Sequence, residues 1–241
     1  MPIIVPFYKS NGLDQFDIML LQSVVYSLTI AVFEIPSGYL ADLWGRKNTL
    51  ITGAILGFSG FLTYCFSYEL ELFMVAEFIL GIGQSLISGS DSAMLYDTLM
   101  EHKKSKEYAK YEGRLTAFGN FAESIAGVLG GSVLVLVSLR MPFYFQAGVA
   151  FLAIPAALTL YEPMRHKTLM RFSFKDILKI VKDSLVNNKK RKTTIIFSSF
   201  IGTCTLTMAW FVQPYFLFVD VPLPLFGVFW PLLNLLVGVV S

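Results

Sequence analysis

Long uninterrupted stretches of apolar residues constrain this sequence of 241 residues more than any other feature. Each complete stretch has about 20 residues, the length at which a helix crosses a hydrocarbon layer of about 30 Å. Hydrophobic residues make up 55% of the chain and charged residues 15%, too few to give a water-exposed fold a polar surface. The sequence therefore predicts an all-α protein, a polytopic bundle of transmembrane helices.

Complete stretches fill most of the sequence, and partial stretches stand at its two ends. The complete ones are residues 18–41, 48–67, 72–96, 115–138, 142–161 and 193–219. A further stretch begins near Leu225 and is still apolar at Ser241, and the short run 2–7 resembles the end of another span. We therefore expect a helical bundle that is incomplete at both ends.

Basic residues are distributed unequally between the loops. Of the 19 Lys and Arg residues, 17 lie in one set of alternate loops, and only Lys9 and Arg140 lie in the other set. Since basic loops stay on the cytoplasmic side during insertion, we expect a multi-pass protein of the cell membrane whose long central loop, residues 162–192, is cytoplasmic. The same rule accounts for the basic clusters without nucleic acid as a partner.

Apolar residues at helical spacing in segment 173–185 predict an amphipathic helix on the membrane surface.

A short charged loop, GYLADLWGRK at residues 38–47, joins the first two complete stretches. Gly38 would let a neighbouring helix approach closely, and Gly45 would permit the backbone angles of a tight turn. Asp42 would accept hydrogen bonds from the start of the next helix or pair with Arg46. The loop is therefore expected to be a short, rigid, charged hinge on the cytoplasmic side.

This loop resembles the signature of the major facilitator superfamily, G-x-x-x-D-[RK]-x-G-[RK]-[RK], which lies between the second and third helices of those transporters. Position 43 departs from the signature, with Leu where a base is usual. The resemblance implies that Asp42 and Arg46 help to lock a cytoplasmic gate. It implies the following gate motif: Gly38, Asp42, Gly45, Arg46 and Lys47.

The resemblance covers the whole chain and implies that its stretches correspond to helices two to eight of the family. Three regions follow from this correspondence. Residues 1–161 would form the N-terminal transmembrane half, with the first helix mostly missing. Residues 162–192 would be the cytoplasmic linker, and residues 193–241 would begin the C-terminal transmembrane half.

Polar residues inside the predicted spans mark candidate sites, because ionisable groups in a bilayer are costly and usually functional. In the third stretch they recur at helical spacing and form one polar stripe, and the first and fourth stretches repeat the pattern. The candidates for a substrate or coupling cavity are Glu34, Glu77, Gln84, Asp91, Asn120 and Glu123. For serine, threonine and asparagine we favour the other interpretation, in which they join helices by hydrogen bonds.

No Lys or Arg lies within a predicted span, so an anionic substrate would find no partner there, and the acids would carry protons or hold a cation. This pattern favours proton-coupled movement of cationic or neutral lipophilic compounds. Two departures from the family's proton antiporters weigh against a direct transfer of their mechanism. Glu77 stands where their fourth-helix motif, R-x-x-x-G-x-G, has its arginine, and residues 126–131, AGVLGG, lack the proline of their fifth-helix motif, G-P-x-x-G-G.

The resemblance implies a secondary transporter that works by alternating access, with efflux of small molecules as the expected activity. Its partners would be a small-molecule substrate, protons and the lipid bilayer.

We expect no cofactor and no metal, since Cys65 and Cys204 each lie alone in a span. We expect no enzyme either, because Asp91 and Asp97 share one helix, about 120° apart, and could not meet as an intramembrane protease requires. A non-transporting remnant or interaction subunit is the alternative.

Overall fold

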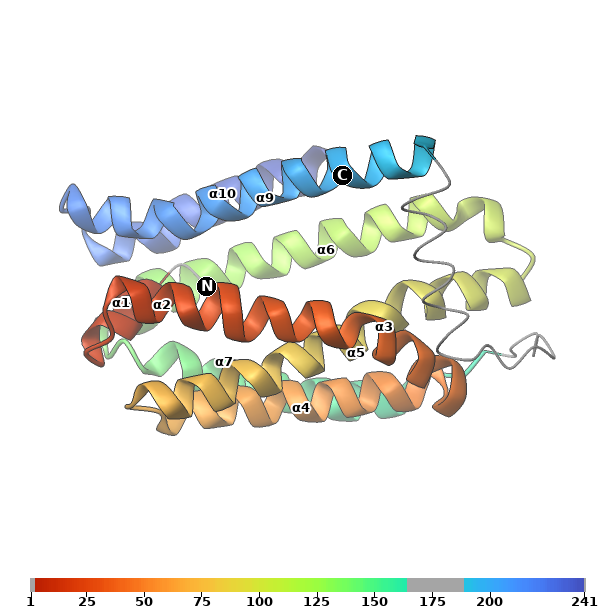
Figure 1. Cartoon of the computed structure of the whole chain (residues 1–241), viewed down its shortest axis with the longest axis horizontal. Coiled ribbons are helices and arrows are strands. Elements are labelled where there is room, and N and C mark those ends of the chain that lie inside the picture. Colours follow the sequence, from red (N-terminus) through yellow and green to blue (C-terminus); the bar gives the residue numbers. More distant parts are fainter. Residues whose placement is uncertain (1–2, 164–188, 241) are drawn as a thin grey trace. The chain divides into compact units, whose positions relative to one another are not determined.

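The computed structural model describes residues 3–163 and 189–240 and is helical, without strands in that part of the chain (Figure 1). The prediction of an all-α fold is thereby confirmed. The chain divides into two compact units, of which the first comprises Met1–Arg165 with Pro222–Ser241 and the second comprises His166–Val221. The described helix of the second unit is α9 (Lys189–Phe218).

The first unit contains the other described helices, several of which lie lengthwise beside one another (Figure 1). In chain order they are α1 (Ile4–Ser10), α2 (Gln15–Met19), η1 (Leu20–Tyr26), α3 (Ser27–Trp44), α4 (Arg46–Phe66), α5 (Leu70–Glu101), η2 (Ser105–Glu107), α6 (Tyr108–Val128), η3 (Leu129–Val133), η4 (Leu134–Leu136), α7 (Met141–Thr159) and α10 (Leu223–Val240). Two of these segments, η1 and η3, are π-helical. The segment η1 leads directly into α3, and η3 directly follows α6.

Six helical stretches among the described residues are long and apolar enough to cross a membrane. They are Gln15–Trp44, Arg46–Phe66, Leu70–Glu101, Ser105–Leu136, Met141–Thr159 and Arg191–Phe218, which confirms the six complete stretches predicted above. The predicted amphipathic helix at residues 173–185 lies outside the described residues. The boundaries proposed for the linker stay predictions.

Glycines allow α4 and α5 to pack closely. A Cβ atom at Gly83 would lie 3.2 Å from the Gly53 carbonyl oxygen, and a Cβ atom at Gly53 would lie 3.1 Å from the Gly83 carbonyl oxygen. The two backbones therefore touch, as they do where small residues mediate helix packing in membranes. This crossing fixes the direction of α5, which carries three of the six candidate cavity residues, Glu77, Gln84 and Asp91.

Arg140, just before α7, holds the C-terminal end of α4. Its Nη2 donates to the Asn11 Oδ1 at 2.6 Å, and its guanidinium carbon lies 3.9 Å from the centre of the Tyr68 ring. Its Nη1 donates to three carbonyl oxygens at the end of α4, of which that of Tyr64 also accepts from the Ser67 amide. They belong to Tyr64 (3.4 Å), Cys65 (3.1 Å) and Ser67 (2.7 Å). We call this the Arg140 end of the unit, and the opposite end, where α4 begins, the Arg46 end.

Two serines join α10 to α6 and η3. The Ser124 hydroxyl donates to the Pro231 carbonyl oxygen at 3.2 Å, and the Ser132 hydroxyl donates to the Pro224 carbonyl oxygen at 2.6 Å. The glycine-containing segment 126–131, discussed above as a departure from an antiporter motif, lies between these serines. It therefore forms part of a helix contact.

Candidate functional site

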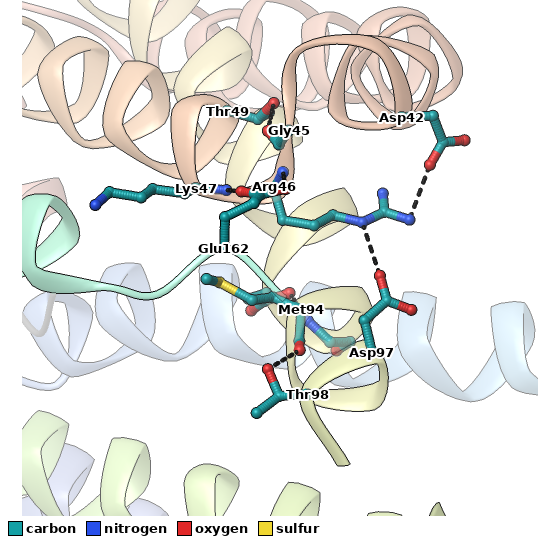
Figure 2. Close-up of polar contacts among 11 residues, drawn as sticks. Asp42, Gly45, Arg46, Lys47, Thr49, Met94, Asp97, Thr98 and Glu162 are labelled. Carbon is teal, nitrogen blue, oxygen red and sulfur yellow. Dashed lines mark hydrogen bonds and ion pairs between the residues drawn. The ribbon is translucent and has the colours of Figure 1, made fainter. Parts of the chain in front are cut away.

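The loop at the Arg46 end turns sharply at Gly45. This residue has φ of 112° and ψ of 146°, a conformation that residues with a side chain rarely adopt. Its carbonyl oxygen accepts a hydrogen bond from the Thr49 hydroxyl at 2.8 Å, which fixes the first turn of α4 (Figure 2). The tight turn predicted at Gly45 is present.

Arg46 links the ends of three helices through its side chain. Its Nη2 lies 2.8 Å from Asp42 Oδ1 in α3, and its Nε lies 3.5 Å from Asp97 Oδ2 near the end of α5 (Figure 2). The side chain is only 14% exposed, so the contact with the 21%-exposed Asp97 is shielded from water better than an ordinary surface pair. The pairing of Asp42 with Arg46, one of two alternatives expected for Asp42, is observed.

Glu162, just after α7, covers the beginning of α4. Its Oε1 accepts from the Arg46 amide at 3.0 Å, and its Oε2 accepts from the Lys47 amide at 2.7 Å. A carboxylate in this position satisfies amides that have no partner within the helix and lies at the positive end of the helix dipole. Lys47 contributes its backbone here, while its side chain points away from Asp97 (Figure 2).

We name these residues the Arg46 cluster: Asp42, Gly45, Arg46, Lys47, Asp97 and Glu162. Linear spacing did not reveal the parts played by Asp97 and Glu162, because Glu162 is 116 residues from Arg46 and Asp97 is 51 residues away. One signal was available. Both acids lie where apolar stretches end on the same side as the loop, so they were candidates to meet its bases.

The expected role of Gly38 needs correction. A Cβ atom at Gly38 would find nothing within 4 Å, so its lack of a side chain is not what allows a helix to approach. A Cβ atom at the facing Gly89 of α5 would lie 3.6 Å from the Gly38 amide nitrogen, which is an ordinary van der Waals distance. The helices are in contact here, but the space between them does not require either glycine.

The polar stripe of α5 divides into an exposed part and a buried part. Gln84, Ser88 and Asp91 are exposed, and the Ser88 hydroxyl donates to Glu34 Oε1 of α3 at 3.1 Å. The stripes of the first and third stretches therefore meet. In α6, Glu123 is exposed and Asn120 is half-buried.

Glu77 belongs to the buried part and lies toward the Arg140 end. It is 3% exposed, and its Oε1 accepts hydrogen bonds from the side chains of Tyr8, Gln22 and Tyr64. The sequence indicated none of these partners, which come from three other helical segments. Glu77 therefore does not share the exposed surface of Gln84 and Asp91.

A sequence profile of the Major Facilitator Superfamily matches residues 1–241. The chain belongs to the Major Facilitator Superfamily. Within this superfamily, the chain is 25% identical over 169 residues to "Quinolone resistance protein NorA" of Staphylococcus aureus (strain MRSA252), covering 70% of this chain and 42% of that protein. It is 24% identical over 226 residues to "Uncharacterized MFS-type transporter YxaM" of Bacillus subtilis (strain 168), covering 89% of this chain and 53% of that protein.

The chain thus spans about half the length of the curated relatives it matches. Together with the six apolar helices, the superfamily membership identifies it as a multi-pass membrane protein. Four residues of the Arg46 cluster lie in the loop that resembles the superfamily signature, namely Asp42, Gly45, Arg46 and Lys47. Leu43 is the position at which this loop departs from the signature.

Proposed function

We propose that this protein is a secondary transporter that moves small molecules by alternating access, with the Arg46 cluster acting as part of its cytoplasmic gate. The observation that carries the proposal is the convergence of three helix ends, α3, α4 and α5, and of Glu162 on one shielded arginine. Alternating access requires groups of helices that move together. The cluster would make these segments move as one body at the gate.

Polar residues within the spans, all exposed except the half-buried Asn120, supply the proposed substrate path. Glu34, Asp91 and Glu123 offer carboxylates, and Gln84 and Asn120 offer amides. Intramembrane carboxylates commonly mark substrate and proton pathways. We therefore propose proton-coupled efflux of cationic or neutral lipophilic compounds, which agrees with the name of the staphylococcal relative, a quinolone resistance protein.

The proposal is tested by dye efflux from bacteria that lack their main efflux pumps and express the complete reading frame. Cells loaded with a fluorescent lipophilic cation should lose it faster than cells with an empty vector, and a protonophore should abolish the difference. Asp97→Asn should slow this loss about tenfold at equal membrane abundance, since a hydrogen bond to a charged group contributes about 1.5–3 kcal/mol. The matched control is Glu107→Gln, an acid in η2 that is half-buried like Asp97.

Each result has a separate meaning. Equal dye loss with and without the protein would contradict transport of this class of compound and favour the non-transporting interaction subunit. Efflux that persists with the protonophore would contradict proton coupling alone. A normal rate in Asp97→Asn would show that the Arg46 cluster is not needed at the gate.

A further inference from the structure

Glu77 has an unusual position for a carboxylate, because it is buried where four helical segments meet. Tyr8 in α1 donates to its Oε1 at 2.7 Å, and the Tyr64 hydroxyl in α4 donates to the same oxygen. The Gln22 amide in η1 also donates to Oε1 and to the Tyr8 oxygen. The carboxylate of Glu77 in α5 is thus hydrogen-bonded to α1, η1 and α4 at the same time.

The groups that face Glu77 are neutral. Among the described residues Glu77 forms no salt bridge, and the titratable groups facing it are the phenols of Tyr8, Tyr64 and, within electrostatic range, Tyr26 of η1. Phenols remain protonated near neutral pH. The three hydrogen bonds favour the carboxylate, whereas burial away from water favours the neutral acid, so the two effects oppose each other.

Glu77 is also separate from the exposed acids. Asp91 lies 14 residues further along the same helix, which is about 21 Å at 1.5 Å per residue. Glu77 lies toward the Arg140 end, and Asp91 lies toward the Arg46 end. The helix α5 therefore carries two acids far from each other, the buried Glu77 and the exposed Asp91.

We propose that Glu77 is the residue that binds the coupling proton, while the exposed residues around Asp91 serve the substrate. This inference rests on the proposed function. The carboxylate takes one proton from water on one side of the membrane, forming one O–H bond, and returns it to water on the other side. Protonation removes the charge that holds the Tyr8, Gln22 and Tyr64 donors, so it loosens the contacts of α1, η1 and α4 with α5.

The complete protein in proteoliposomes provides the transport test, with Glu77→Gln as the variant. Transport driven by a pH gradient should fall at least tenfold, whereas exchange of labelled dye at equal pH on both sides should persist. The matched control is Glu71→Gln, an exposed acid in the first turn of the same helix, which should leave both activities unchanged. Gradient-driven transport at the wild-type rate in Glu77→Gln would overturn the proposal, as would equal loss of both activities.

An infrared measurement makes the test independent of transport. The pH-difference spectrum of the purified protein should contain a band of a protonated carboxylic acid that Glu71→Gln retains and Glu77→Gln lacks. If the wild-type protein moves no dye but this band depends on Glu77, the proton site stands and the proposed transport fails. If Glu77→Gln does not fold, Tyr64→Phe, which removes one donor, should displace the pH at which the band appears, and an unchanged band would overturn the proposal.

Discussion

At the scale of single residues, the loop at the Arg46 end depends on one backbone conformation. Gly45 has a positive φ, and a side chain there is expected to cost about 1–3 kcal/mol. We predict that Gly45→Ala lowers the melting temperature of the detergent-solubilised protein, measured by loss of its size-exclusion peak. Gly38→Ala, seven residues earlier in the same loop motif, should not lower it, because a Cβ atom there meets nothing within 4 Å. An equal fall in both variants would contradict this explanation.

The sequence revealed local residue partners better than distant ones. Asp42 and Arg46 are four residues apart, so their spacing indicated the pairing as one of two alternatives for Asp42. The contacts of Arg46 with Asp97 and of its amide with Glu162 join separate helices, and only the folded chain determines which helix ends meet. The partners of Glu77 were hidden for the same reason.

At the scale of helices, the contact between α4 and α5 depends on the absence of side chains. A Cβ atom at Gly83 would lie 3.1 Å from the Leu56 Cβ and 3.2 Å from the Gly57 amide nitrogen. We predict that Gly83→Leu forces the two helices apart and destabilises the protein by about 1–3 kcal/mol or more, as overpacking does. Gly148→Leu in α7 is the control, since that position is exposed and its Cβ atom meets nothing within 4 Å. Thermal unfolding followed by size-exclusion chromatography compares them, and equal stability of the two variants would contradict close packing.

The sequence predicted where the helices lie along the chain better than it predicted which side chains of each helix face its neighbours. Apolar length located the six confirmed spans, because the bilayer thickness sets that length. The stripes assumed 3.6 residues per turn, whereas η1 and η3 are π-helical and shift the faces that follow them. Gln22 lies in η1, which helps to explain why its contact with Glu77 did not emerge from helical spacing.

At the scale of the whole molecule, the distribution of basic residues predicts the orientation in the membrane. Lys104 and Glu69 are exposed and lie at opposite ends of α5. With Cys65 and Cys204 replaced, an impermeant maleimide should label Glu69→Cys in intact cells, and it should label Lys104→Cys only after the membrane is opened. The physical reason is that basic loops remain in the cytoplasm. Labelling of position 104 from outside would reverse the topology.

The two arginines that hold the ends of α4 have partners of different kinds. Arg46 meets the carboxylates of Asp42 and Asp97, whereas Arg140 meets carbonyl oxygens, the Asn11 amide and aromatic rings, which carry no net charge. Dissolved ions weaken attraction between opposite charges, with a screening length of about 8 Å at physiological ionic strength. Rising ionic strength therefore loosens the junction at the Arg46 end more than the junction at the Arg140 end. The contacts at the Arg46 end of α4 therefore depend on the electrolyte, and those at its Arg140 end depend on it far less.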